Sequence, residues 1–399
     1  MGDWRRTVKD LEKEGTLLVQ DGNHGEYRPR PAEFGDVGTA FIRAADLKEG
    51  RILFESAQKI NGIARDRVRK GIGASNDVIL SHKGTVGKVS FAPAGSPPFV
   101  CSPQTTFWRS MDHDVIDPMY LYAFLRSDSF QVQLRSRENE SDMAGYVSLT
   151  EQRRLQVTVP PIDLQRAIAG VLEVLDGRIN ASERIASIAD ELIRCIYSSA
   201  LAAPGAREMA LFDAMDIAFG APFASSDFNS KGNGRPLLRI RDLKTFRPQV
   251  WTTQQLDKEL MVAPGDTVAG MDAEFRPTFW LGESALLNQR VLHARSLVGG
   301  GESLCREALR GPLAMVEGYK TGTTVAHLNK RDLATVLLEI PSADAISSFE
   351  AATKPLHERI VACAAEARAA AALRDTLLPQ LMSGKLRVRD AERIVEDAV

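Results

Sequence analysis

The strongest constraint on this chain is an internal repeat, because a duplicated sequence folds into two domains of one plan. Residues 38–47, GTAFIRAADL, align with residues 234–243, GRPLLRIRDL, at a separation of 196 positions. The glycine, an arginine, the aspartate and the apolar positions agree. A chain of 399 residues, 44% of them apolar, is also long enough to bury more than one core. We therefore expect two similar domains.

The separation between matching residues shrinks along the chain, as it does in duplicates that have lost loop residues. Residues 77–80 match residues 266–269 at 189 positions, and Pro160 matches Pro341 at 181. Each copy begins with short apolar runs bounded by turn residues, such as 77–80 and 88–91, which predict strands. Each copy ends in a long helical pattern. The predicted fold class is α+β, with short strands plus helices in both copies.

The helical patterns predict a coiled-coil seam. In residues 162–203 the seam positions recur at steps of four and three, at Ile168, Leu172, Leu175, Ile179, Ser182, Ala186, Ala189, Ile193, Ile196 and Ala200. The second copy repeats the pattern with Arg374 in one slot, at Leu356, Ile360, Cys363, Ala367, Ala370, Leu377 and Leu381. Pro355 predicts a first-turn position or a kink there, and Pro379 predicts that the helix ends or bends near Leu378.

One helix after each domain makes an antiparallel pair the natural closure, and some 40 helical residues span roughly 60 Å, between one and two turns of B-DNA. This organisation predicts two DNA-reading domains related by a pseudo-twofold axis and held apart by a rigid spacer. The predicted segments are a first domain (1–160), a central spacer helix (161–203), a second domain (204–341), a distal spacer helix (342–384) and a C-terminal tail (385–399).

Composition leaves this interpretation open. The formal net charge of -2 by itself disfavours nucleic-acid binding, but residues 51–100 carry eight basic and three acidic side chains. That local excess suits either a phosphate-facing patch or an ordinary solvated surface. The four cysteines form no CxxC pair, and no apolar stretch approaches the roughly 20 residues of a membrane span. We expect a cytoplasmic chain that has no membrane partner and binds no metal.

Polar residues in two glycine-containing loops are the candidate DNA contacts of the first copy. The loop over residues 21–28 carries Asp21, Asn23, His24, Tyr27 and Arg28, which suit base edges or phosphates, or else a turn that caps its own backbone. The segment 81–88 carries Ser81, Lys83, Thr85 and Lys88, which suit a phosphate contact or a plain hairpin turn.

The second copy places acidic residues where the first has lysine. Asp272 and Glu274 could accept from cytosine, or could pair with Arg276 and Arg290. The remaining candidates are polar side chains elsewhere in the copy, at Arg239, Gln289, Lys320, Thr321 and Thr323. The two half-sites should then differ chemically.

Enzyme classes find little support in the motifs. Asp117-Pro118-Met119-Tyr120 is close to the Asp-Pro-Pro-Tyr motif of amino-methyltransferases, but Met119 breaks it, and Asp117 with Pro118 predicts a helix N-terminus. No Glu-x-Lys occurs, and the six histidines show no metal-ligand spacing.

The chain resembles the specificity subunit of a type I restriction-modification enzyme over nearly its whole length. The most specific motifs are LLPQLMSGKL (377–386), VPPIDLQRAI (159–168) and DGNHG (21–25). Family-like segments also occur, in the same order along the chain, at 81–88, 270–276, 287–290 and 321–328. Two features depart from the pattern: Pro355 within the second helix, and Ser342-Ala343-Asp344 in place of a proline-rich helix entry.

The resemblance implies two target-recognition domains that each read one half of a bipartite double-stranded DNA site. It implies helices that hold two methyltransferase subunits, through Ile168, Leu172, Leu175, Ile179, Ile193, Leu356, Ile360, Leu377 and Leu381, and a complex that recruits restriction subunits. The chain itself would bind no cofactor and have no catalytic residue, while S-adenosylmethionine, ATP and Mg²⁺ would serve the partner subunits. A stand-alone bipartite DNA-binding regulator and a methyltransferase-associated scaffold remain the alternatives.

Overall fold

A computed structural model describes residues 4–22, 25–138, 145–320 and 327–398 of the chain. The described chain forms two compact units, the first made of residues 1–177 with 371–399 and the second of residues 178–370. Both boundaries fall inside long helices, so each unit contains part of each helix. The domain boundaries expected from the sequence stay a proposal.

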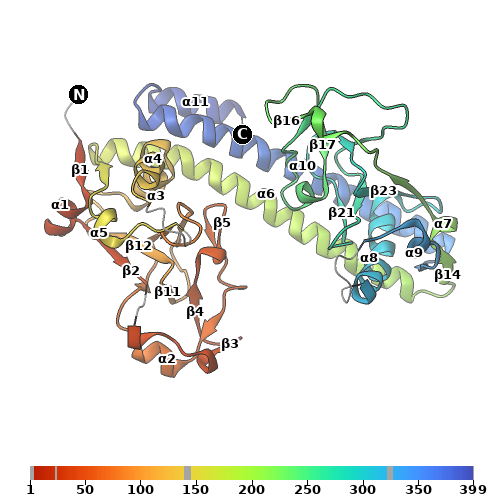
Figure 1. Cartoon of the computed structure of the whole chain (residues 1–399), viewed down its shortest axis with the longest axis horizontal. Coiled ribbons are helices and arrows are strands. Elements are labelled where there is room, and N and C mark those ends of the chain that lie inside the picture. Colours follow the sequence, from red (N-terminus) through yellow and green to blue (C-terminus); the bar gives the residue numbers. More distant parts are fainter. Residues whose placement is uncertain (1–3, 23–24, 139–144, 321–326, 399) are drawn as a thin grey trace. The chain divides into compact units, whose positions relative to one another are not determined.

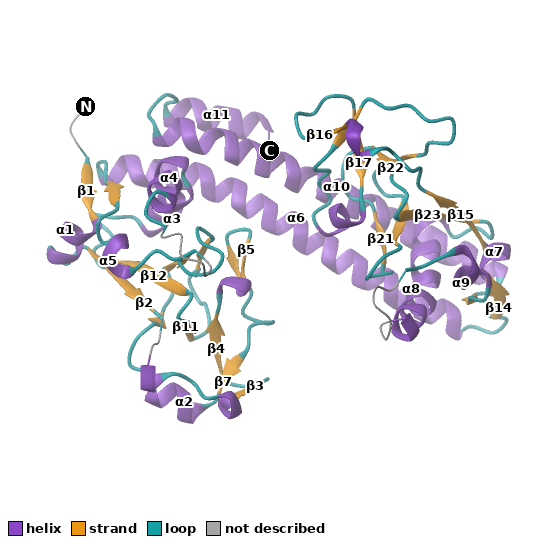
Figure 2. Ribbon diagram, viewed as in Figure 1, coloured by secondary structure: helices purple, strands orange, loops and turns teal. Residues whose placement is uncertain are grey.

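The first unit is built on two main sheets (Figures 1 and 2). The six-stranded sheet has the order β2 (Leu17–Asp21), β12 (Thr105–Ser110), β9 (Val78–Ser81), β10 (Val89–Phe91), β6 (Arg51–Ile52) and β5 (Leu47–Lys48). The five-stranded sheet has the order β3 (Phe34–Gly35), β7 (Lys59–Ile60), β4 (Thr39–Ile42), β11 (Phe99–Cys101) and β8 (Ile72–Gly73). A further pair joins β1 (Arg5–Thr7) to β13 (Gln156–Thr158).

Short helices complete this unit: α1 (Val8–Lys13), α2 (Gly62–Arg67), α3 (Pro118–Arg126), α4 (Asp128–Arg135) and α5 (Leu149–Gln152). The predicted start of α3 is confirmed, because the Asp117 side chain accepts from the Tyr120 amide and Pro118 is the first helical residue. The apolar side chains of α3 and α4 cover the sheet, and the Phe130 ring packs edge-on against Trp108 at 5.5 Å.

The second unit repeats the plan. One sheet has the order β15 (Met215–Phe219), β23 (Val291–Ser296), β20 (Thr267–Gly270) and β21 (Pro277–Phe279). The other has the order β16 (Phe228–Asn229), β18 (Trp251–Thr252), β17 (Arg235–Leu238), β22 (Ala285–Leu287) and β19 (Met261–Val262). β14 (Arg207–Ala210) pairs with β24 (Leu337–Ile340), and the helices are α7 (Leu211–Ala214), α8 (Gly301–Lys320) and α9 (Lys330–Ala334).

Strand register confirms the repeat residue by residue. In the parallel pair β4–β11, Phe41 lies opposite Val100, and in β17–β22 the matching residues Leu237 and Leu286 lie opposite each other. After each of these strands a carboxylate caps a short turn: Asp46 accepts from the Arg43 amide at 2.8 Å and Asp242 from the Arg239 amide at 3.0 Å. The 196-residue separation found in the sequence is therefore a true structural equivalence.

Two long helices run through the units, α6 (Ile162–Ala202) and α10 (Ala343–Met382). In the first unit Asp176 of α6 pairs with Arg374 of α10 at 2.6 Å, and in the second unit Ser182 of α6 donates to Glu366 of α10 at 3.1 Å. Positions rise along one helix as they fall along the other, so the pair is antiparallel, as predicted. Arg374 is tolerated in the seam because Asp176 neutralises it.

Most of the predicted seam is buried. Ile168, Leu172 and Leu175 of α6 and Leu377 and Leu381 of α10 are buried in the first unit, and Ile193 and Ile360 are buried in the second, while Ile179 and Leu356 are half-buried. Ile193 and Ile360 belong to the core cluster of the second unit, so burial of the seam also ties the helices to the domain cores. The predicted mixed fold with two copies and two long helices is confirmed.

Three expectations about the C-terminal part were wrong or incomplete. Pro355 lies well inside α10, which begins at Ala343, so it is not a first-turn residue. Pro379 does not end the helix near Leu378, because α10 continues to Met382 before the left-handed Gly384. The expected tail contains a helix, α11 (Val388–Ala398), which buries Ala391 and Val395.

No helix in the described residues is long and apolar enough to cross a membrane.

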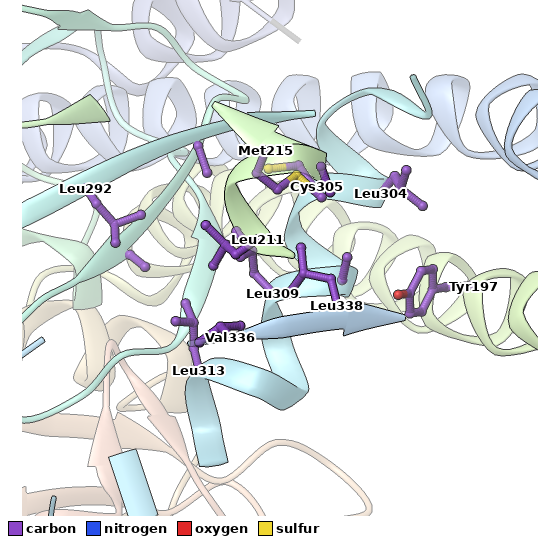
Figure 3. Close-up of a cluster of buried hydrophobic side chains, with 14 of the residues drawn as sticks. Tyr197, Leu211, Met215, Leu292, Leu304, Cys305, Leu309, Leu313, Val336 and Leu338 are labelled. Atoms are coloured by element: carbon purple, nitrogen blue, oxygen red, sulfur yellow. The ribbon is translucent and has the colours of Figure 1, made fainter. Parts of the chain in front are cut away.

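The core of the second unit extends onto α6. Apolar side chains of α7, β15, β23 and α8, among them Leu211, Met215, Leu292 and Leu309, gather in one buried cluster (Figure 3). Tyr197 of α6 lies at the edge of this cluster and donates its hydroxyl to the Glu339 carbonyl at 2.9 Å. The sheet unit and its stretch of helix therefore share one core.

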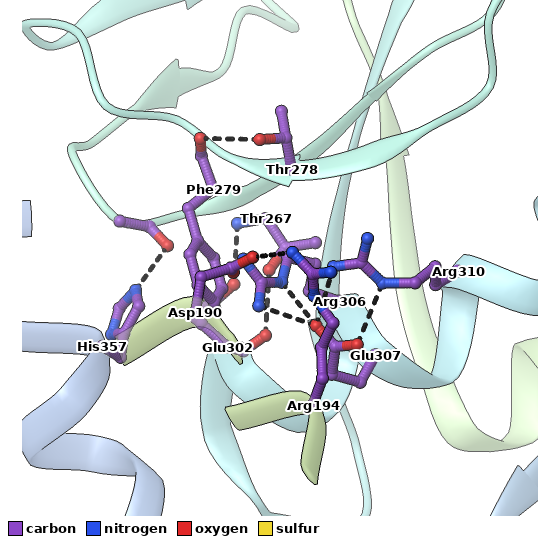
Figure 4. A network of polar contacts seen from close by, with 11 residues as sticks. Asp190, Arg194, Thr267, Thr278, Phe279, Glu302, Arg306, Glu307, Arg310 and His357 are labelled. Atoms are coloured by element: carbon purple, nitrogen blue, oxygen red, sulfur yellow. Dashed lines mark hydrogen bonds and ion pairs between the residues drawn. The ribbon is translucent and has the colours of Figure 1, made fainter. Parts of the chain in front are cut away.

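A polar network lies beside that core (Figure 4). Arg306 of α8 is buried and stacks over the Phe279 ring at 3.8 Å. It pairs with Asp190 of α6 and, at 2.7 Å, with Glu307, which also binds Arg310. Burial would raise the pKa of Asp190, but the charges of Arg306 and Arg194 outweigh it and lower that pKa. The network thus couples α8 to α6 through paired charges.

Candidate nucleic-acid interface

The glycine-containing segment 83–88 of the first copy is the hairpin turn between β9 and β10. Gly84 and Gly87 have φ of 83° and 95°, left-handed values that favour glycine. Ser81 is buried, and its Oγ accepts from the Lys88 amide at 2.8 Å, so this predicted DNA contact instead stabilises the turn. Lys83 and Thr85 are exposed. The plain-hairpin interpretation is therefore correct for the backbone, and DNA contact by the exposed side chains stays a prediction.

Two other segments lie beside this hairpin. Lys83 forms a β-bridge with Tyr146, and its Nζ lies 5.9 Å from the centre of that ring. At the same end of the sheet, the His82 amide donates to the carbonyl of Gln104, which immediately precedes β12, at 2.9 Å, and the His82 carbonyl accepts from the Val147 amide at 2.9 Å. A cation, an aromatic ring and an amide thus meet at one end of the sheet, and we call Lys83, Gln104 and Tyr146 the first cluster.

The second copy has an equivalent arrangement with different chemistry. Asp272 forms a β-bridge with His327, and the Met271 amide donates to the carbonyl of Arg290, which immediately precedes β23, at 3.0 Å. Asp272 Oδ1 lies 2.7 Å from His327 Nδ1 and 3.5 Å from Arg290 Nη1. We call Asp272, Arg290 and His327 the second cluster.

Ion pairs in the second copy settle one alternative from the sequence. Asp272 pairs with Arg290, as one interpretation proposed, but Glu274 pairs with Lys244 at 2.8 Å. Arg276 is exposed and has no ion-pair partner among the described residues. Arg276 immediately precedes β21, just as Lys88 immediately precedes β10 in the first copy. The Nζ of Lys88, however, donates to the Ala44 carbonyl at 2.9 Å. Arg276 is therefore the better placed of these two cations to meet a ligand.

The loop after β2 lies close to the first cluster. Asp21 is the last residue of β2 and pairs with Thr106 of β12, two residues beyond Gln104. The chain then forms a short 3-10 turn (Gly25–Tyr27); Tyr27, its last residue, and the following Arg28 are exposed. Asn23 and His24 lie outside the described residues.

A basic segment adjoins this loop. Arg67 of α2 donates to the Arg28 carbonyl at 3.0 Å, and the Gly71 amide donates to Gln20 Oε1 at 2.9 Å. The Arg67 guanidinium is engaged by Glu33, whose pKa this pairing lowers to about 2. Other cations of the segment, Arg69 and Lys70, are exposed and form no ion pair within the described chain. The local positive charge is therefore only partly neutralised.

The remaining predicted contacts are distributed unevenly. Arg239 is mostly buried beside Asp242, where it supports the turn after β17. The Gln289 side chain is exposed, while its backbone N–H donates to the Ala221 carbonyl at 3.0 Å. Lys320 ends α8, and its side chain, like Thr321 and Thr323, lies outside what the structure describes.

Gln104, Tyr146 and His327 were not predicted. The repeat contained the signal, because the 181-residue separation that relates Pro160 to Pro341 also relates Tyr146 to His327. Tyr146 belongs to no recognisable motif, and His327 was part of the family-like segment 321–328 without being named as a contact, so only the strand pairing shows that they lie at matching positions. Among the described residues no group of three or more acidic, histidine or cysteine side chains could hold a metal ion.

The fold has a counterpart among solved proteins. A crystal structure of a type I restriction-modification system S subunit from M. genitalium aligns with 94% of this chain and 95% of its own length, at 12% identity and a TM-score of 0.59. A crystal structure of the HsdS subunit from Thermoanaerobacter tengcongensis aligns over 97% of this chain and 98% of that one, at 18% identity and a TM-score of 0.37. The match to the M. genitalium S subunit establishes a shared fold.

The sequence has a relative of the same class. The chain is 32% identical over 182 residues to the specificity subunit of the type I restriction enzyme EcoBI from Escherichia coli. This alignment covers 45% of the chain and 34% of that protein, so it spans about a third of the relative's length. No protein-family model matches the chain. These matches confirm the resemblance to type I restriction-modification specificity subunits that the motifs indicated.

Proposed function

We propose that this chain is a DNA sequence-specificity subunit that reads a bipartite double-stranded target. The observation that carries the proposal is the pair of equivalent clusters: the same fold presents Lys83, Gln104 and Tyr146 in one copy and Asp272, Arg290 and His327 in the other. Hydrogen-bonding side chains of different chemistry at matching positions suit the recognition of two different base sequences.

The alternatives make different use of the same surface. A stand-alone regulator would read the same kind of site without enzyme partners, whereas a scaffold would show no sequence-selective, salt-sensitive binding to DNA. The sequence similarity to a restriction enzyme's specificity subunit favours the role of specificity subunit over both the regulator and the scaffold. The chain then selects the site, and methyltransferase and restriction subunits perform the chemistry with their own S-adenosylmethionine, ATP and Mg²⁺.

Selection of bound duplexes from a random library tests this function. The full-length chain, together with its methyltransferase subunit, should enrich two unlike short blocks separated by a fixed number of unread bases. The spacing should be fixed because one continuous helix, α6, connects the two copies along the chain. Binding without an enriched sequence would favour the scaffold, and a single enriched block would contradict a bipartite reader.

The long helices are the proposed docking surface for two methyltransferase subunits. Within the second unit, α6 exposes a row of apolar side chains at helical spacing, Ile185, Ile188 and Leu192, which are 40%, 49% and 46% exposed. Contiguous apolar side chains on a helix face are typical of subunit contacts. Most of the seam residues named from the resemblance are instead buried within the chain itself.

Changing this row should separate docking from folding. We expect Ile188→Asp to abolish co-purification with the methyltransferase subunit, because it places a charge in the centre of an apolar contact. Thermal unfolding of the isolated chain should be nearly unchanged, since the side chain is half exposed. Leu297→Asp, at an exposed leucine outside the helices, is the control and should retain the partner. Full retention by Ile188→Asp would place the docking surface elsewhere.

A further inference from the structure

Gln104 and Arg290 occupy the same place in the two copies. Each is the last residue before the second strand of its sheet, β12 next to β2 in one copy and β23 next to β15 in the other. Each presents its carbonyl to the amide of the residue that follows the neighbouring strand, His82 after β9 at 2.9 Å or Met271 after β20 at 3.0 Å. The backbone therefore holds both side chains at an equivalent position beside the hairpin, although one is an amide and the other a guanidinium.

A close backbone approach fixes each of these positions further. Two residues before Gln104, the Ser102 carbonyl lies so close to Gly22 that a Cβ on that glycine would be 1.8 Å from the oxygen. Two residues before Arg290, the Asn288 carbonyl would lie 2.1 Å from a Cβ on Gly220. Both segments are thus clamped against the strand-end loop of their own copy, and their side chains project from rigid backbone.

Both side chains retain hydrogen-bonding capacity. The Gln104 side chain is exposed, and its amide group forms no hydrogen bond within the described residues. The Arg290 side chain is 49% exposed, and its contacts with Asp272 and His327 all involve Nη1. The contact with Asp272 holds the guanidinium in place while Nε and Nη2 are not engaged by the described residues.

These two chemistries match different bases. The side-chain amide of glutamine presents a donor group beside an acceptor group. In the major groove its NH₂ can donate to N7 of adenine while its carbonyl oxygen accepts from the N6 amino group. A guanidinium carries donors only, which fit N7 and O6 of guanine. We propose that Gln104 specifies an adenine in the half-site of the first copy and that Arg290 specifies a guanine in the half-site of the second. The inference rests on the proposed function and adds the residue and base that each copy uses.

Reciprocal substitutions test the assignment in the full-length chain. We expect Gln104→Arg to change one position of the first block from adenine to guanine, and Arg290→Gln to change one position of the second block from guanine to adenine. Each change should be roughly 5- to 150-fold in relative binding, the range of one bidentate base contact. In each variant the other block should stay as in the wild type, which shows that the chain is folded and bound.

Two further variants guard the interpretation. Gln104→Met keeps the length of the side chain without its amide, and should flatten the preference at the same single position. Arg295→Gln is the same arginine-to-glutamine change near the other end of β23, and it should leave both blocks unchanged.

The outcomes distinguish this inference from the function on which it rests. If the wild type enriches two blocks and neither Gln104→Arg nor Arg290→Gln alters a base, the inference is overturned. Equal weakening of all sequences would also overturn it, because it would assign these residues to phosphate contacts. Failure of the wild type to enrich two blocks would instead refute the proposed function.

Discussion

Arg306→Met should lower the free energy of unfolding of the second unit by about 3–5 kcal/mol, the usual cost of removing one partner from a buried charge network. Methionine keeps much of the volume over the Phe279 ring but cannot neutralise Asp190 or Glu307 (Figure 4). Both carboxylates would then depend on the more exposed Arg194 and Arg310. Denaturant unfolding of the full-length chain, followed by a probe in this unit, measures the change.

The matched control is Arg310→Met in the same helix. Arg310 binds the same glutamate, but its side chain is 29% exposed while that of Arg306 is 6% exposed. Water can replace the lost partner there, so we expect a loss of less than about 1 kcal/mol. Equal effects of the two substitutions would contradict the view that burial makes Arg306 the essential member.

The pH dependence separates lost charge from lost packing. Without Arg306, burial would raise the folded-state pKa of the Asp190 carboxyl above its unfolded value, because desolvation is the largest influence on this group and one of its two cationic partners is lost. Such a penalty is present in full above the raised pKa and disappears as the pH falls and the carboxyl becomes protonated. The stability difference between wild type and Arg306→Met should therefore shrink from pH 7 toward pH 5. A difference independent of pH would show that the loss is one of packing.

Gly22→Ala should destabilise the first unit by about 3 kcal/mol or more, because it forces backbone apart. Its Cβ would lie 1.8 Å from the Ser102 oxygen and 2.6 Å from the Cys101 oxygen, and neither atom belongs to a side chain that could rotate away. Thermal unfolding of the unit should shift down, and reading of the first half-site should fail, since this contact clamps the segment that carries Gln104.

Gly35→Ala is the control for this substitution. Gly35 lies at the end of β3 in the same unit, and a Cβ there would meet no atom within 4 Å. It should therefore change stability by less than about 1 kcal/mol. If Gly22→Ala proves equally harmless, the close approach of the two backbone segments does not exist in solution.

The sequence was most informative where a pattern depends on near neighbours. The repeat around residues 38–47 predicted equivalent strands, and the observed pairs Phe41–Val100 and Leu237–Leu286 show that the equivalence extends to register. The N-terminus of α3 at Asp117 followed from two adjacent residues. Such features are determined within a few positions of the chain, so they can be predicted without knowing the fold.

Which candidate site residues are exposed was harder to predict, because exposure depends on distant residues. Ser81 and Arg239 have polar side chains, yet the fold uses one to stabilise a hairpin and the other to support a turn. Tyr146 and His327 were missed, because each is brought to its cluster by a bridge to a residue more than 50 positions earlier. Helix length also escaped local rules: Pro379 ends no helix, and α10 continues past it to Met382.

By itself, then, the sequence determined the duplication, the short strands followed by a long helical segment in each copy, and the resemblance to specificity subunits. The tertiary structure alone decided which polar side chains remain exposed, and that Lys83, Gln104 and Tyr146 stand where Asp272, Arg290 and His327 stand in the other copy. The physical reason is range. Periodicity and capping involve residues a few positions apart, whereas burial and strand pairing join segments far apart in the chain.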